Sequence, residues 1–101
     1  MCKSTNSSTN GTSFHDVTIR ASVQQLTNAF GDPAYECNTG EDKVNFEWDM
    51  ETEEGDIFTI YDWKEYRMVD KNEQIEWHIG SFSKLDSITA KEEISKSLKN
   101  N

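Results

Sequence analysis

Carboxylates crowd one short segment of this 101-residue chain, and their spacing favours binding to a basic surface. The net charge is −9, and residues 41–56 alone hold eight carboxylates and one lysine, a local charge of −7. On a strand, alternate side chains share a face at intervals of roughly 6.6 Å. Such a row can occupy the places of phosphates on a basic, nucleic-acid-binding protein. The predicted partner-binding residues are Glu47, Asp49, Glu51, Glu53, Glu54 and Asp56.

This segment has two other interpretations. One stays open, and the other fits the sequence poorly. A solvated sheet face that keeps a small domain soluble has the same composition. A calcium loop fits poorly, because residues 49–60 place Glu54 where an EF-hand needs glycine and Ile60 where it needs a bidentate glutamate. His15 and His78 lack the spacing of a zinc site. We expect no metal and no cofactor.

Aromatic and basic residues alternate in two later segments and indicate a second kind of site. Aromatic rings beside cationic groups suit a nucleobase and its phosphate, through stacking and charge pairing. Core packing is the ordinary alternative for such rings. The predicted ligand-binding residues of this alternative site, for a small cyclic or signalling nucleotide, are Tyr61, Trp63, Lys64, Tyr66, Arg67, His78, Ser81 and Ser83.

The sequence offers little for catalysis. No G-x-S-x-G motif surrounds Ser81, so a nucleophile elbow is absent. Glu76 and His78 share a strand face, but a surface pair explains them. We therefore expect a protein that binds rather than an enzyme.

Periodicity predicts the elements that must position these residues. Residues 17–20 alternate as a short strand, and Ser22 to Gln25 has the form of a capping box that opens a helix ending before Gly31. Residues 44–51 and 57–63 form a hairpin, and residues 75–79 form a last strand. Thr89 to Glu92 is a second capping box before a final helix. The predicted fold is α+β, a small antiparallel sheet of three to four strands with two helices, in the order β-α-β-β-β-α.

Composition bounds the domain organisation. Residues 1–13 are expected to be a disordered polar leader, and residues 14–101 a single domain. The leader lacks the apolar stretch of a secretory signal, and Cys2 and Cys37 are isolated thiols, so a cytoplasmic location is expected. The acidic charge and apolar content exclude direct nucleic-acid binding and a membrane span. An exposed sheet edge would allow two copies to pair as a homo-oligomer.

Two segments carry a resemblance to a protein group. At Thr59-Ile60-Tyr61-Asp62-Trp63-Lys64 and Ile75-Glu76-Trp77-His78-Ile79-Gly80 the chain resembles small bacteriophage and prophage accessory proteins. The resemblance runs from about Val17 to Leu98. It implies a role in host takeover or counter-defence, through stoichiometric binding of a defence protein or sequestration of a nucleotide signal. It assigns no functional residue.

Overall fold

The computed structural model describes residues 1–100 and contains two helices and six strands in that range. The helices are α1 (Val23–Phe30) and α2 (Lys84–Lys99). The strands are β1 (Lys3–Ser4), β2 (Ser13–Ala21), β3 (Tyr35–Glu36), β4 (Phe46–Glu51), β5 (Ile57–Tyr61) and β6 (Ile75–Ser81). Every strand pairing is antiparallel, and the α+β class is confirmed.

The strand count corrects the prediction of three to four strands. The four longer strands follow the predicted order with the helices, but β1 and β3 add two more. Each of these has only two residues, which is too short for an alternating pattern to show. Both pair with the same edge of β4, β3 beside Phe46 and Glu47, and β1 beside Met50 and Glu51. Together they cover backbone groups that an edge strand would leave unpaired.

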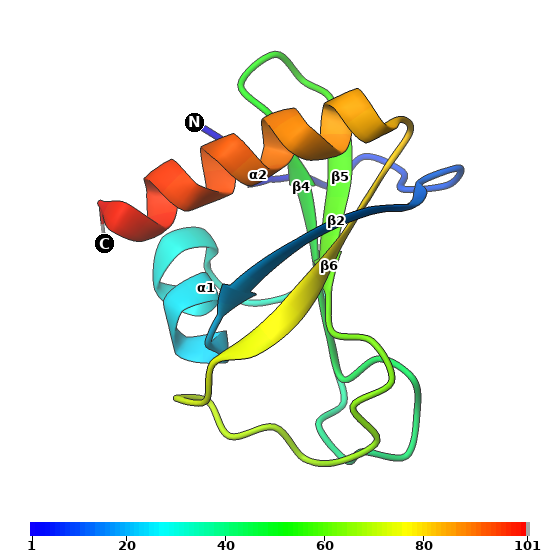
Figure 1. Cartoon of the computed structure of the whole chain (residues 1–101), viewed down its shortest axis with the longest axis vertical. Helices are drawn as coiled ribbons and strands as arrows, with labels where there is room; N and C mark the ends of the chain where they lie inside the picture. The colour runs from blue at the N-terminus through cyan, green and yellow to red at the C-terminus, as the bar shows by residue number, and fades with distance from the viewer. Residues whose placement is uncertain (101) are drawn as a thin grey trace.

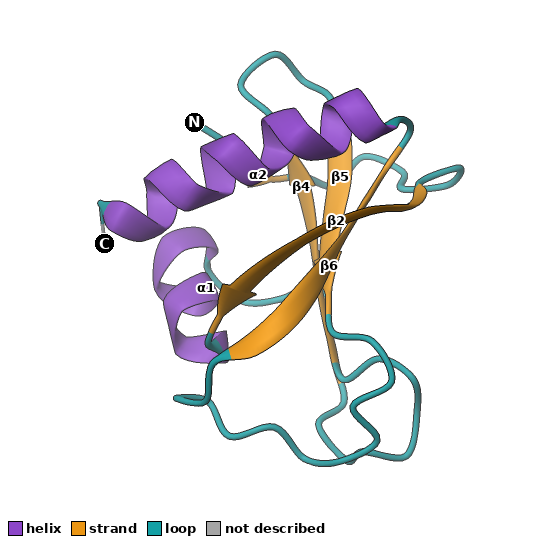
Figure 2. Ribbon diagram, viewed as in Figure 1, coloured by secondary structure: helices purple, strands orange, loops and turns teal. Residues whose placement is uncertain are grey.

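The sheet has the strand order β1-β4-β5-β6-β2, with β3 also beside β4. Helix α2 crosses one face of the sheet and packs on β2, β6 and β5, and α1 lies next to α2 (Figures 1 and 2). We call the side that the helices cover the inner face and the opposite side the outer face. The helices therefore cover the inner face, and neither of the two described helices packs on the outer face.

Two tryptophans dominate the core on the inner face. Trp48 of β4 is 1% exposed and Trp77 of β6 is fully buried, and their rings meet edge to face with centroids 5.5 Å apart. The indole N–H of Trp48 donates to the carbonyl oxygen of Gly31, and that of Trp77 donates to the carbonyl oxygen of Ala21, both at 2.9 Å. Each ring therefore buries its carbon surface and still pairs its one polar group.

The start of α1 matches the predicted capping box. The hydroxyl of Ser22 accepts from the backbone N–H of Gln25 at 3.1 Å, and the Gln25 side chain accepts from the N–H of Ser22 at 2.9 Å. Gly31 follows the helix with φ at +83°, a conformation that favours glycine. Local sequence therefore determines both ends of this helix.

The start of α2 corrects the second capping-box prediction. Ser83 is the N-cap, its hydroxyl accepting from the N–H of Asp86 at 3.1 Å, so Thr89 to Glu92 lies inside the helix. The inward position of the early turns is Ser87, a buried polar residue, and the buried apolar positions begin only at Ala90. Helix α2 thus begins before its first buried apolar residue, so the apolar pattern does not mark its start.

The leader also differs from the prediction, because residues 1–13 are part of the fold. Cys2 is 8% exposed, with its sulfur 3.9 Å from the Ser97 hydroxyl, and burial raises the pKa of its thiol. The Ser4 hydroxyl donates to the carbonyl oxygen of Phe30 at 2.9 Å. Since β1 and β2 lie at opposite edges of the sheet, residues 5–12 must cross it, and they run (blue in Figure 1) to the start of β2. The buried side chain of Cys2 and the pairing of β1 with the edge of β4 thus hold the leader in place, although its composition favours disorder.

Candidate functional site

Cross-strand pairing aligns one row of side chains across the outer face. Glu47 of β4 pairs with Tyr61 of β5, which pairs with His78 of β6, and Thr18 of β2 continues the row. Tyr35 of β3 pairs with Glu47 from the other side. Alternation along each strand places these residues opposite the buried tryptophans. The sheet therefore gathers residues from five strands that are distant in sequence.

A second cross-strand row on the outer face supplies the aromatic ring of Phe14 and a position without a side chain at Gly80. Asp49 pairs with Thr59, Thr59 with Gly80, and Gly80 with Phe14. A Cβ on Gly80 would lie 2.6 Å from the Thr59 hydroxyl oxygen, so the second row has no space for a side chain there. A register shift between Phe14 and Thr18, with Asp16 at a φ of +63°, brings Phe14 to this place.

Four rings from β2, β5, β6 and the segment after β5 form what we call the outer-face cluster: Phe14, Tyr61, Trp63 and His78. The imidazole of His78 stacks on Phe14 with centroids 3.8 Å apart and an interplanar angle of 11°. It also lies 5.5 Å from the Tyr61 centroid and 6.2 Å from the Trp63 centroid. Burial lowers the pKa of His78, against the opposing effect of Glu76 and Asp16, so the imidazole is neutral at pH 7. The cluster is thus an uncharged aromatic surface, and its Trp63 ring is 41% exposed.

Two lysines flank the most exposed ring of the cluster. The Nζ of Lys64 lies 5.5 Å and the Nζ of Lys43 lies 5.9 Å from the Trp63 ring centroid. The backbone N–H of Lys64 donates to the carbonyl oxygen of Lys43 at 2.7 Å, which holds the two segments together. Lys43 was not predicted as a site residue. The hairpin register could have indicated Lys43. When the pairing of Glu47 with Tyr61 is continued beyond the strands, residue 43 lies opposite residue 65, next to Lys64.

An open cleft of about 250 Å³ lies beside the cluster. The leader and the start of β2 form one wall, and β4, β5, β6 and the residues flanking the hairpin form the rest. Its lining residues are Thr9, Thr12, Ser13, Val44, Glu47, Thr59, Tyr61, Trp63 and Gly80. A second cleft, lined by Tyr35, Asp42, Val44 and Glu47, adjoins the first. A disordered leader would form no wall of a cleft, so the sequence predicts none of these leader residues at the site.

Glu47 lies where the two clefts meet, and its carboxyl group is half-buried. Burial, and then the neighbouring Asp49, raise the pKa of Glu47 to about 7. One carboxyl oxygen of Asp49 is buried and has no hydrogen-bond partner within the described chain. No lysine or arginine forms an ion pair with either carboxylate among residues 1–100. The pair is therefore available to a donor from outside the protein.

Asp62, in the middle of a distinctive segment, holds the site in place. One of its carboxyl oxygens accepts from the backbone N–H groups of Asn45 and Phe46, at 2.9 and 2.8 Å, and the side chain is fully buried. Burial raises the pKa of Asp62, although these hydrogen bonds oppose the shift. Lys64 and Tyr66 follow with positive φ values of 55° and 49°. Non-glycine residues persist in this conformation only where the surroundings hold them, so the segment after Trp63 is tightly constrained.

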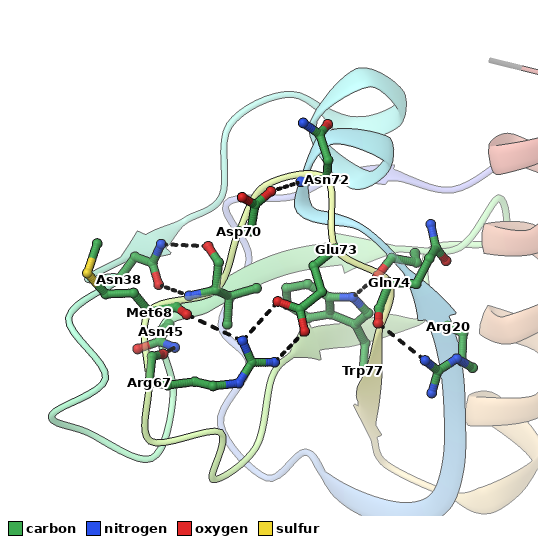
Figure 3. A network of polar contacts seen from close by, with 12 residues as sticks. Arg20, Asn38, Asn45, Arg67, Met68, Asp70, Asn72, Glu73, Gln74 and Trp77 are labelled. Atoms are coloured by element: carbon green, nitrogen blue, oxygen red, sulfur yellow. Dashed lines mark hydrogen bonds and ion pairs between the residues drawn. The ribbon is translucent and has the colours of Figure 1, made fainter.

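The connection after the cluster, for which the sequence predicted no conformation, is organised by polar contacts (Figure 3). The side chain of Asn38 donates to the carbonyl oxygen of Val69 and accepts from its N–H, at 2.9 and 2.7 Å. The guanidinium of Arg67 donates two hydrogen bonds to the carboxylate of Glu73, at 2.8 and 2.7 Å. This contact lowers the pKa of Glu73 and raises that of Arg67. Arg67 therefore stabilises the connection, and its charge is already paired.

The predicted ligand-binding residues thus divide into two groups. Tyr61, Trp63, Lys64 and His78 come together at the outer-face cluster. The structure does not bring the others there. The buried hydroxyl of Ser81 contacts that of Ser87, and Ser83 caps α2. The remaining two are the paired Arg67 and the exposed Tyr66.

The six predicted partner-binding carboxylates do not form the single row expected from the strand pattern. Glu47, Asp49 and Glu51 are half-buried on the outer face. Glu53, Glu54 and Asp56 are exposed at the tip between β4 and β5, and the tip lies beside α2. The Glu53 N–H donates to the Glu93 carboxylate of α2 at 2.9 Å. The turn redirects the chain after Glu51, so the two halves of the acidic segment face different surroundings.

Comparison with known proteins adds no family. No protein-family model, no curated protein and no solved structure matches the chain. Between residues 1 and 100, no three His, Cys, Asp or Glu side chains gather in an arrangement that could hold a metal ion. In the same part of the chain, neither helix has the length and apolar character needed to cross a membrane.

Proposed function

We propose that this protein binds a nucleotide at the outer-face cluster and holds it without chemical change. The observation that carries the proposal is the exposed Trp63 ring with the ammonium groups of Lys43 and Lys64 within 6 Å of its centroid, beside a cleft lined with hydroxyl groups. The ring provides a stacking surface for a base, and the lysines provide charges for a phosphate. A phage accessory protein would use such binding to sequester a nucleotide signal.

The size of the cleft and its mixed charge support this class of ligand. Its volume of about 250 Å³ is slightly below the usual range for small-molecule pockets, so it fits one base while the phosphate stays outside. Stacking of one base on an aromatic side chain contributes about 1–3 kcal/mol. A purely anionic ligand would meet Glu47 and a purely cationic one would meet the lysines. A nucleotide carries hydrogen-bond donors on its base and negative charge on its phosphate, and thus suits both.

One serine and one histidine lie near the cleft, and their geometry favours holding over catalysis. The Nε2 of His15 lies 3.3 Å from the hydroxyl of Ser13 and 3.0 Å from the carbonyl oxygen of Ser81. A carbonyl oxygen only accepts, so the shorter contact requires that Nε2 carry the proton. This nitrogen then cannot remove a proton from Ser13, and the pair lacks a general base.

Calorimetry against a panel of nucleoside monophosphates and cyclic dinucleotides tests the proposal. We expect heat for at least one member, and at least a tenfold loss of affinity in Trp63→Ala, since a stacked base is lost. Lys64→Ala should weaken binding and reduce its dependence on salt. Arg67→Ala is the matched control, because its charge is paired with Glu73 away from the cleft. Absence of heat for every member of the panel would contradict the proposal.

The acidic segment supports a second candidate function, docking on a basic protein. The supporting observation is the exposed tip that carries Glu53, Glu54 and Asp56 in a chain of net charge −9. Reversal of these three residues to lysine should abolish capture of a basic partner from host lysate, and raised salt should weaken capture by the unaltered protein. Reversal of Glu47, Asp49 and Glu51 is the comparison variant. Equal capture by all three proteins would remove this candidate.

A further inference from the structure

We propose that Glu47 makes the cleft selective for guanine among the nucleobases. This inference rests on the proposed nucleotide binding and names the ligand more closely. A carboxylate offers two acceptor oxygens in one plane. The N1–H and the 2-amino group of guanine are two adjacent donors in the plane of the ring, so one carboxylate accepts from both. Adenine presents a ring-nitrogen acceptor next to its amino group, and that lone pair would face the second oxygen.

The position of Glu47 relative to the rings supports this assignment. Glu47 is directly opposite Tyr61 in the strand register and lines the same cleft as Trp63. A base lying against the Trp63 ring can therefore place its edge at Glu47, which faces the same cleft from the β4 side. Among the residues that line this cleft in the described chain, Glu47 is the only carboxylate. The other polar lining side chains are hydroxyls, which both donate and accept and therefore discriminate weakly, and the indole of Trp63, which only donates.

No cation holds the carboxylate of Glu47 within residues 1–100. The ladder neighbour of Glu47, Tyr35, is exposed. Lys43 and Lys64 lie over the Trp63 ring. The base edge and the phosphate of one guanine nucleotide would thus meet opposite charges on two sides of one ring. Asp49, two residues along the same face, contacts Glu47, and burial together with this contact raises the pKa of Glu47 to about 7, so the carboxylate form that accepts from the base predominates above that pH.

The test is calorimetry with GMP, IMP, AMP and CMP on the unaltered protein at pH 8, where Glu47 is ionised. We expect GMP to bind about tenfold or more tightly than AMP, the discrimination typical of one bidentate contact. IMP keeps N1–H but lacks the 2-amino group, so its affinity should lie between the two. Equal affinities for GMP, IMP and AMP would overturn the inference and leave nucleotide binding intact. Binding of none of the four, together with no heat from the wider panel, would remove both.

Two variants assign the selectivity to this residue. Glu47→Gln keeps the size of the side chain but replaces one acceptor oxygen by a donor, so the preference for GMP over AMP should fall to within about threefold. Glu51→Gln is the matched control, a carboxylate on the same strand and face that does not line the cleft. It should keep the full preference. A preference for GMP that survives in Glu47→Gln, with both variants showing unaltered far-UV circular dichroism, would overturn the assignment.

Discussion

Strands β5 and β6 present alternate side chains to two different surroundings. On the inner face, Ile60 and Trp77 are fully buried, and the one polar group of Trp77 is paired. On the outer face, their sequence neighbours Tyr61 and His78 are half-buried beside the exposed Trp63. The inner rings complete a core, whereas the outer rings stand next to two lysines and a half-buried glutamate. The difference shows that aromatic content alone does not distinguish core from site; the face of the strand does.

The largest expected effect separates the two faces by stability. Trp77→Ala should lower the free energy of unfolding by about 3–5 kcal/mol, because it leaves a cavity in a packed core and an unpaired carbonyl. Trp63→Ala should change it by less than about 1 kcal/mol, because an exposed ring has little packing to lose. Urea denaturation of both variants measures the contrast. Similar losses would mean that the outer cluster is a second core.

Removal of the Asp62 side chain should have the next largest effect. Asp62→Ala leaves the buried N–H groups of Asn45 and Phe46 without an acceptor, for a loss of about 2–4 kcal/mol. Asp62→Asn keeps one acceptor oxygen and should lose less. Urea denaturation gives the stabilities, and titration with the best nucleotide of the panel should show weaker binding as the lysines lose their positions. Unchanged stability in Asp62→Ala would show that these contacts do not hold the site.

The leader should contribute to the packing on both faces of the sheet and so to stability. Deletion of residues 1–5 removes the buried Cys2 and the pairing of β1 with β4, and we expect a loss of about 1–2 kcal/mol. Ser8→Ala, in the exposed part of the leader, should leave stability unchanged. Thermal unfolding monitored by circular dichroism compares the three proteins. An unaltered transition in the deletion variant would restore the disordered leader that the sequence predicts.

The smallest effect is a dependence of stability on pH that arises at Glu47. Folding raises the pKa of Glu47 from its usual 4.5 to about 7, so the folded state binds this proton more tightly than the unfolded state. The contribution to stability is therefore complete below about pH 4.5 and is lost as the pH rises through 7. Because the group is half-exposed, we expect the difference to be about 1 kcal/mol after solvent screening.

Glu47→Gln has no proton to lose and removes this dependence. The difference in melting temperature between Glu47→Gln and the unaltered protein should therefore be larger at pH 8 than at pH 5, in favour of the variant. Glu51→Gln is again the control on the same face. A difference that is the same at both pH values would exclude Glu47 as the titrating group.

Local patterns explain why part of the fold was predictable. The capping box of Ser22 and Gln25 and the alternation through β4 depend on residues close in sequence, and both were confirmed. The start of α2 was missed because Ser87 interrupts the apolar period that marks an inward helix face. Strands β1 and β3 were missed because two residues form a strand only when another edge accepts them.

The candidate site was likewise predictable where its residues lie close together in the sequence, and not where distant segments meet. Tyr61, Trp63, Lys64 and His78 were predicted from two short segments, and the structure brings them together. Phe14 and Lys43 were missed, because a register shift in β2 places the first and the pairing of two loops places the second. Ser81, predicted for the site, faces inward because it shares the strand parity of Trp77 and Ile79, and its hydroxyl contacts that of Ser87 in α2.

The sequence by itself determined the negative charge, the strand alternation and the aromatic segments, since composition and period are properties of neighbouring residues. Only the tertiary structure decided which rings became core and which became surface. That choice depends on where the helices pack, and helices that pack on one face leave the other open. The path of the leader was decided in the same way, because its anchors, β4, Phe30 and Ser97, lie far from it in the chain.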